Sequence, residues 1–111
     1  MQSDRLDQMI RGWFVGDFSP AIARSTGCEV AIQRYVAGDR EPLHHHKVAT
    51  EITVVLSGQA RMFDRVWSDG DIITIAPGEA TAFEALTDVT TVVVKLPSVA
   101  GDKYLGAADS V

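Results

Sequence analysis

Features that mark several other protein classes are scarce in this sequence of 111 residues. Its single cysteine, Cys28, excludes an internal disulfide and fits a reducing compartment. Lysine and arginine number 10 against 15 acidic residues, so the chain lacks the basic footprint that nucleic-acid binding requires. Apolar runs such as residues 92–94 fall far short of the roughly 20 residues of a membrane span, and residues 1–10 lack a signal peptide's apolar stretch. We therefore expect a cytoplasmic protein that binds neither nucleic acid nor membranes.

The composition is that of an ordinary globular domain. Hydrophobic residues make up 46% and charged residues 23% of the chain, close to the averages of folded proteins. A chain of this length can bury one modest core. We expect a single domain over residues 1–111, with a C-terminal tail at 98–111 that is either mobile or docked through Tyr104 and Leu105.

Short stretches rich in β-branched and aromatic residues alternate with turn residues along the chain. The only helical pattern is short and covers residues 3–10, with Ser3 as its expected cap. Strands at this spacing, without long helices between them, favour an all-β antiparallel sandwich or barrel. The predicted strands cover residues 13–18, 28–36, 43–46, 51–56, 60–63, 71–75, 80–84 and 90–96.

Two histidines and a carboxylate lie close together in the sequence. Because strand side chains alternate between faces, His44 and His46 should share one face and His45 should lie on the other. Glu51 begins the next predicted strand, which we expect to pair antiparallel with the histidine strand and bring the carboxylate to the same face. Two imidazoles and one carboxylate, with open positions, suit divalent iron and related metals.

Two simpler interpretations of the same residues stay open. Glu51 can instead pair with Lys47 or Arg61 at a solvated strand edge. Three consecutive histidines can also bind metal adventitiously during purification. Neither interpretation assigns a cellular function to the cluster.

The spacing of these residues matches a known family motif. Gly38, five residues, His44-x-His46, four residues, Glu51, six residues and Gly58 resemble the first cupin motif at every fixed position. The resemblance implies a jelly-roll barrel, the double-stranded β-helix of the cupin fold. It also implies a metal site formed by His44, His46 and Glu51.

A second segment, residues 70–85, is similar to the second cupin motif but departs from it. Its Pro77-Gly78 turn fits the motif, whereas Thr81 stands where the family usually has its last metal-binding histidine. A neutral hydroxyl is a much weaker ligand than an imidazole. The resemblance therefore implies either a divalent metal (Fe, Mn, Ni or Zn) bound by fewer ligands or a metal-free pocket.

The alternation of side chains also predicts the rest of the pocket. A small concave site with a few convergent polar groups is typical of ligand binding, and here it suits a small polar molecule such as a carboxylate or a sugar. If the chain follows the register of the family that it resembles, His44, His46, Glu51 and Thr81 face the interior, and Gln33, Tyr35, Arg61 and Lys95 are further candidates at its mouth. The predicted lining, besides the metal ligands, is Tyr35, Thr53, Arg61, Thr81 and Phe83.

Three functions fit these observations. The first is a small barrel that binds a divalent metal, a small polar ligand, or both. The second is a metal-dependent dioxygenase, or an isomerase or epimerase of a sugar or small acid in which Glu51 or His46 is the catalytic base. The third is a non-catalytic dimeric interaction module with a vestigial pocket. We expect a homodimer, for which the apolar strand at Trp13-Phe14-Val15 offers a sheet edge.

Overall fold

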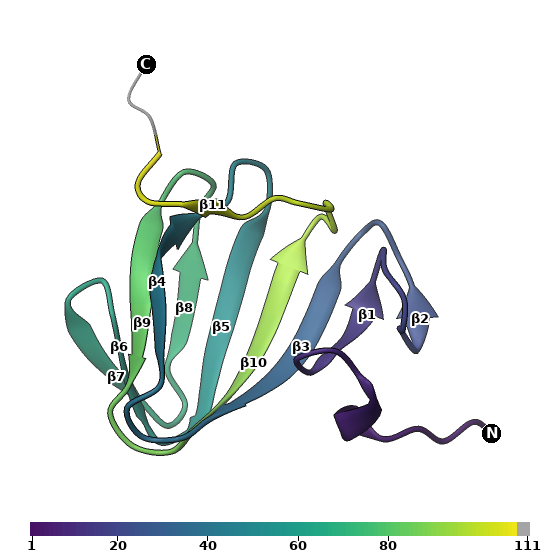
Figure 1. Cartoon of the computed structure of the whole chain (residues 1–111), viewed down its shortest axis with the longest axis horizontal. Helices are drawn as coiled ribbons and strands as arrows, with labels where there is room; N and C mark the ends of the chain where they lie inside the picture. The colour runs from purple at the N-terminus through teal and green to yellow at the C-terminus, as the bar shows by residue number, and fades with distance from the viewer. Residues whose placement is uncertain (109–111) are drawn as a thin grey trace.

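Two β-sheets face each other in the computed structural model of the chain, which describes residues 1–108 (Figure 1). One sheet has six strands in the order β2-β1-β3-β10-β5-β8, and the other has five in the order β11-β4-β9-β6-β7. All pairings are antiparallel except that of β1 with β2. The strands are Trp13–Gly16 (β1), Ala23–Arg24 (β2), Glu29–Tyr35 (β3), Arg40–His45 (β4), Thr50–Ser57 (β5), Gln59–Met62 (β6), Arg65–Ser68 (β7), Ile72–Ile75 (β8), Ala80–Ala85 (β9), Val89–Leu96 (β10) and Tyr104–Leu105 (β11).

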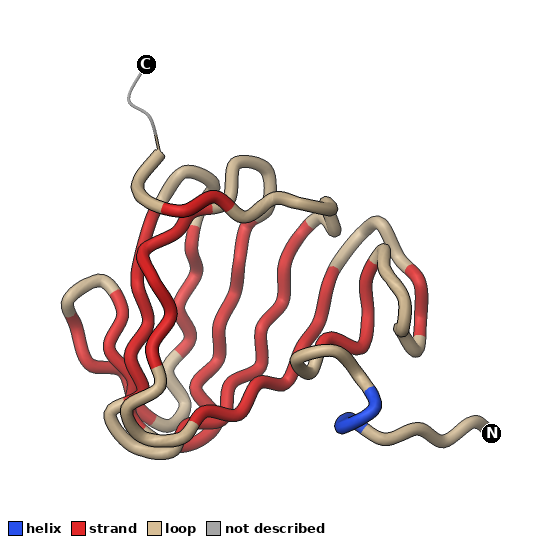
Figure 2. Tube along the Cα trace, viewed as in Figure 1, coloured by secondary structure: helices blue, strands red, loops and turns tan. Residues whose placement is uncertain are grey.

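The all-β antiparallel barrel is confirmed, and each of the eight predicted strands is present (Figure 2). β4 begins three residues before its predicted start at 43, and the short strands β2, β7 and β11 were not predicted. The helical segment is reduced to the 3-10 turn Leu6–Gln8 (η1), and Ser3 does not cap it, because Arg5 holds the cap position without a side-chain hydrogen bond. Within residues 1–108, no helix has the length and apolar character needed to cross a membrane.

Alternating side chains divide each long strand into an inner and an outer row. Along β5 the inward side chains change from Glu51 and Thr53 to the fully buried Val55. β10 runs in the opposite direction beside it, so that Lys95 pairs with Glu51 and Val93 with Thr53. The polar inward side chains of the two strands therefore meet near one end of the barrel.

The apolar core fills the rest of the interior. We define it by its buried members, which come from both sheets: Val55, Ala60, Met62, Ile73, Ile75, Phe83, Ala85 and Val89. Tyr35, Phe63 and Trp67 pack against it.

The glycines that bound the first motif occupy turns that favour glycine. Gly38 and Gly58 both have positive φ angles, of 94° and 93°. At Gly58 an added Cβ atom would also lie 2.0 Å from the backbone oxygen of Asp88, so any side chain would clash. The motif's end positions are thus explained by backbone geometry.

The expected pairing of the histidine strand with the Glu51 strand is wrong. β4 pairs with β9 and β11, whereas β5 pairs with β10 and β8, so the two strands belong to different sheets. Both edges of each strand are already occupied. The carboxylate of Glu51 therefore approaches the histidines across the barrel interior.

The N-terminal strand is not the free edge that was expected. β2 pairs with Val15 and Gly16 of β1, and β3 lies on the other side of β1. The two-residue strand β2 is the edge instead. A homodimer stays a prediction, but Trp13-Phe14-Val15 does not offer it an open strand edge.

The C-terminal segment is docked as far as Gly106, whose N–H donates to the backbone oxygen of Leu43. β11 pairs with β4, joining Tyr104 to His45 and Leu105 to His44 (Figure 1). Since 75% of the Leu105 surface is exposed, the docking comes from backbone pairing and polar contacts more than from apolar packing. Residues 109–111 of the predicted tail lie outside the described residues.

Candidate functional site

A cavity of about 110 Å³ lies inside the barrel beside the end of β4. Seven of the eight predicted site residues line it: Tyr35, His44, His46, Glu51, Thr53, Thr81 and Phe83. Gln33 and Lys95, expected at the mouth, line it as well. Its volume is below the roughly 300 to 1,000 Å³ of pockets for drug-sized ligands, so the cavity suits a small molecule.

The prediction that Arg61 lines the pocket is wrong. Along β6 the side chains of Ala60 and Met62 are buried, so Arg61 between them points outward. There its guanidinium forms an ion pair with Glu84, 3.0 Å from the carboxylate oxygen.

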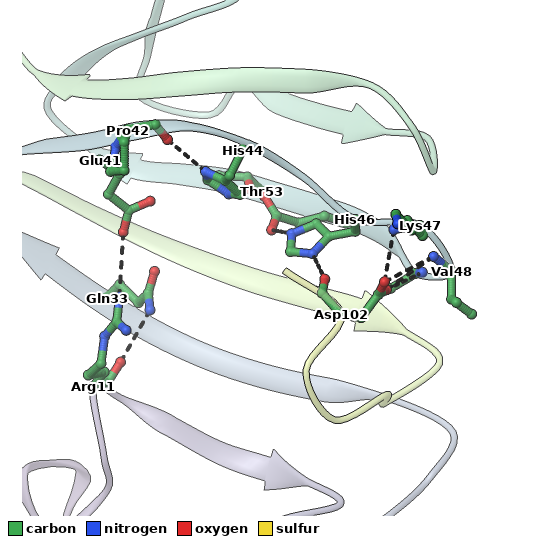
Figure 3. A network of polar contacts seen from close by, with 12 residues as sticks. Arg11, Gln33, Glu41, Pro42, His44, His46, Lys47, Val48, Thr53 and Asp102 are labelled. Atoms are coloured by element: carbon green, nitrogen blue, oxygen red, sulfur yellow. Dashed lines mark hydrogen bonds and ion pairs between the residues drawn. The ribbon is translucent and has the colours of Figure 1, made fainter. Parts of the chain in front are cut away.

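One ring nitrogen of His46 is bound by the C-terminal segment, and the other is buried inside the barrel. Its Nδ1 is hydrogen-bonded to the backbone oxygen of Asp102 (Figure 3). A carbonyl oxygen only accepts, so Nδ1 carries the hydrogen and Nε2 keeps a lone pair in the neutral ring. Nε2 is buried and lacks an aligned hydrogen-bond partner within residues 1–108. It lies 3.3 Å from Oε1 of Glu51.

The other two histidines confirm the predicted alternation. His44 Nδ1 contacts the backbone oxygen of Pro42 at 2.9 Å, so its Nε2 is likewise left as the free nitrogen. The rings of His44 and His46 have centroids 5.5 Å apart. His45 does not line the cavity and instead stacks on Tyr104, with Nδ1 2.8 Å from the backbone oxygen of Gly106.

The carboxylate of Glu51 is kept ionised by its neighbours. Burial acts to raise its pKa, but the contact with His46 and the charge of Lys95 outweigh burial and lower it. The same contact raises the pKa of His46, against the opposing effect of burial. Thr53 adds a hydroxyl donor, 3.0 Å from Oε2 of Glu51.

The edge pairing considered as an alternative for Glu51 is absent among residues 1–108. Its only ion-pair contact there is with His46. Lys47 lies over the ring of Tyr104, at 4.1 Å from its centroid, and Arg61 pairs with Glu84.

Thr81 lines the cavity, but its hydroxyl is used elsewhere. The oxygen accepts a hydrogen bond of 2.9 Å from the N–H of Phe63 and donates one of 2.8 Å to the backbone oxygen of Ala82. The side chain is also buried. At the position of the motif's usual histidine, the chain therefore has a residue that holds the β6–β7 turn.

Asp102 supports the site and was missed at the sequence level. Its buried carboxylate accepts hydrogen bonds from three successive backbone N–H groups, those of Lys47, Val48 and Ala49, at 2.8 to 3.2 Å (Figure 3). Burial acts to raise the pKa of Asp102, but these N–H donors outweigh it and lower the pKa. The residue thus fixes both the His46 ring and the loop that leads from His46 to Glu51. No sequence pattern marked this aspartate.

A second polar network lies at the mouth of the cavity. The Tyr35 hydroxyl lies 2.7 Å from Oε1 of Gln33 and 3.3 Å from Oε1 of Glu41. Arg11 approaches the same Glu41 oxygen at 3.9 Å (Figure 3). Burial, with the nearby Glu41, raises the pKa of Tyr35, so its hydroxyl stays protonated. Arg11 and Glu41 were not predicted, because Arg11 lies outside both motifs and Glu41 is at a position that the first motif leaves unspecified.

The chemistry of the donor set fits a divalent metal. Adjacent donor atoms that bind one ion at about 2.1 Å lie about 3.0 to 3.4 Å apart, and His46 Nε2 and Glu51 Oε1 are separated by 3.3 Å. Residues 1–108 contain no preassembled group of three or more metal-ligating side chains. His44 would therefore have to turn its ring to complete a three-ligand site.

Comparison with known proteins identifies the fold. No family model and no curated protein matches the chain. Among solved structures, an uncharacterized conserved protein with a double-stranded β-helix domain from Klebsiella pneumoniae is 21% identical and superposes with a TM-score of 0.69, over 76% of this chain and 74% of that one. KdgF from Halomonas is 20% identical, with a TM-score of 0.59, over 68% of this chain and 74% of that one. The chain has the cupin fold.

A similar structure from a larger protein is the DMSP lyase DddQ from Ruegeria pomeroyi. It is 19% identical, with a TM-score of 0.70, over 84% of this chain. The match covers 49% of the lyase, so the chain spans about half of that protein. At these identities the similarity establishes the shared fold.

Proposed function

We propose that the chain binds a divalent metal ion through His44, His46 and Glu51 and uses it to hold a small polar molecule in the barrel cavity. One observation carries the proposal. The Nε2 atom of His46 is buried, lacks an aligned hydrogen-bond partner within residues 1–108, and lies 3.3 Å from the Glu51 carboxylate. An imidazole nitrogen buried in this way costs free energy, and a shared ion would satisfy both atoms.

The surroundings of His46 support this assignment. A backbone carbonyl oxygen binds its Nδ1, an arrangement that fixes the tautomer and orients a metal-binding histidine. Thr81 is not a ligand in the proposed site, since its hydroxyl is committed to the backbone. A divalent ion, when bound, would act as a Lewis acid toward an oxygen of the ligand.

The test is metal content and affinity in matched variants. Untagged protein is purified, its metals are measured, and Fe(II), Mn(II), Ni(II) and Zn(II) are titrated without oxygen. The site variant is His44→Ala/His46→Ala. The control is His45→Gln, which removes an imidazole from the same strand but from the opposite face. Circular dichroism shows that each variant is folded.

We expect one equivalent of metal in the wild type and in the control, and none in the double variant. Binding that is lost equally in His45→Gln would indicate adventitious binding to the histidine run and would reject the site. A wild-type protein that binds none of the four metals would also reject it, and would favour the module with a vestigial pocket.

A second candidate is an isomerase or epimerase that uses Glu51 or His46 as a base. The observation that favours it is the direct contact between His46 Nε2 and the ionised Glu51, a pair that can move a proton. In this case turnover of a sugar or small acid should survive chelation of metals and should be abolished by His46→Ala. Turnover that requires metal would exclude it.

A further inference from the structure

The cavity wall has a different charge balance from the chain as a whole. The sequence carries a net charge of −5, but the cavity is lined by three cations, Arg11, Lys95 and Lys103, against two carboxylates, Glu41 and Glu51. An excess of cations around a concave site concentrates anions there. In an acidic protein, such a local excess of positive charge indicates that the cavity binds an anion.

The two carboxylates of the lining leave an excess of one positive charge. Glu41 is approached by Arg11, and Glu51 is in contact with His46. Neither Lys95 nor Lys103 forms an ion pair with a carboxylate of residues 1–108. Two ammonium groups therefore stay available to a ligand in that part of the chain.

Lys95 is also held at the cavity wall. Its ammonium nitrogen lies 4.9 Å from the ring centroid of Trp13, itself a lining residue. A cation–π contact of this kind orients the ammonium group without cancelling its charge. In the β10–β5 pairing Lys95 is directly opposite Glu51, so the cation stands next to the proposed metal ligands.

Lys103 approaches the cavity from a different part of the chain. It follows Asp102, whose buried carboxylate and backbone oxygen fix the segment against His46 and the loop after it. The two lysines thus come from β10 and from the docked C-terminal segment. The cavity between them is small and partly apolar, because Met62, Phe83 and Val93 also line it.

We propose that the cavity binds a small organic carboxylate, held by the ammonium groups of Lys95 and Lys103 beside His44, His46 and Glu51. A carboxylate accepts charge-assisted hydrogen bonds from both lysines, while its short carbon chain packs on the apolar side of the cavity. This carboxylate is the small polar molecule of the proposed function, on which the inference rests. Its contacts with the two lysines do not require the metal ion.

The test compares malonate with its neutral diamide, malonamide, by calorimetry and by amide chemical shifts. The variants are Lys95→Met and Lys103→Met, and Lys47→Met is the matched control. Lys47 is exposed, as Lys103 is, but it lies over Tyr104 and does not line the cavity. Each titration is made on chelator-treated protein and on protein loaded with Mn(II), and inorganic phosphate is titrated in parallel.

We expect malonate to bind, malonamide to bind at least about tenfold more weakly, and each cavity variant to weaken malonate about tenfold, with Lys47→Met unchanged. Equal binding of malonate and malonamide would overturn the inference, as would equal effects in Lys47→Met and Lys95→Met. Lysine-dependent binding of phosphate in place of malonate would also overturn it.

The titrations with and without Mn(II) distinguish the carboxylate site from the metal site of the proposed function. Malonate that binds through the lysines to a protein without metal affinity would support the carboxylate site and reject the metal site. Metal that binds while malonate does not, with or without Mn(II), would support the metal site and reject the carboxylate.

Discussion

The barrel interior has two parts that the same strands build in different ways. In the apolar core, inward side chains such as Val55 and Val89 are fully buried and have no polar atoms to satisfy. In the cavity, His46 and Glu51 are set on the same scaffold, and each polar atom needs a partner. Met62 and Phe83 belong to both parts and form the boundary between them.

The comparison indicates how stability and binding are separated in this molecule. Burial of apolar surface stabilises the fold, whereas the buried Nε2 of neutral His46 lacks an aligned hydrogen-bond partner in the described chain and costs free energy. The outside support from Asp102 offsets part of this cost by fixing the ring and its loop. Changes in the core should therefore alter folding, and changes to the proposed ligands or to the groups that orient them should alter affinity.

The largest effect on stability is expected from Ile73→Ala in the apolar core. Ile73 is buried in β8 and does not line the cavity, and its truncation should lower the free energy of unfolding by about 2 to 5 kcal/mol. Denaturant unfolding measures this loss. The control is Ile72→Ala, since Ile72 is 64% exposed on the same strand and should change stability by less than about 0.5 kcal/mol. Metal affinity of the folded variant should equal that of the wild type. A large loss of metal affinity would show that the apolar core and the cavity are not independent.

Asp102→Ala should affect both parts, because this carboxylate joins the fold to the cavity. Three backbone N–H groups would lose their acceptor, which should cost about 2 to 3 kcal/mol. Looser support of His46 should also weaken metal binding about tenfold. Unfolding and metal titrations measure the two effects.

The control for this variant is Asp39→Ala. The Asp39 carboxylate also accepts a backbone N–H, that of Val36, but in an exposed turn away from the cavity. It should leave metal affinity unchanged. If Asp102→Ala lowered stability and left affinity at the wild-type value, the C-terminal segment would have no part in the site.

These residues also show what could be predicted from the sequence. The alternation of side chains is local, so it placed His44 and His46 together and Thr81 with Phe83 correctly. Strand partners are not local. Strands adjacent in sequence pair in about two-thirds of cases, whereas β4 and β5 belong to different sheets.

The contribution of the C-terminal segment could not be predicted in the same way. β11 has two residues, too few to show alternation. Asp102 orients His46 through its backbone oxygen, an atom that every residue has, so the side chain gives no sign of this contact. Arg61 shows the converse error, because its charge suggested a ligand contact while its register on β6 turns it outward.

Thr81→Val should lower stability by about 1 to 2 kcal/mol without changing metal affinity. The variant leaves the N–H of Phe63 without its acceptor, in a turn where Phe63 and Asp64 already have positive φ angles of 51° and 55°. Thr81→Ser keeps the hydroxyl and is the control. Affinity that falls in the valine variant and recovers in the serine variant would show instead that Thr81 is a metal ligand.

The smallest effect is expected from pH, in metal-free protein, through His46 and Glu51. Glu51 raises the pKa of His46 in the folded state, so this contact stabilises the protein below the unfolded pKa of about 6.5 and the contribution is lost as pH rises through the folded pKa. Unfolding is measured from about pH 5.5 to about pH 9, a range in which Glu51 stays ionised, for the wild type and Glu51→Gln. The advantage of the wild type should shrink as pH rises, because neutral His46 gains less from the carboxylate. An advantage of the wild type that grew with pH would contradict this assignment. It would mean that Glu51 does not stabilise protonated His46, and Lys95 would then be the cation that Glu51 interacts with.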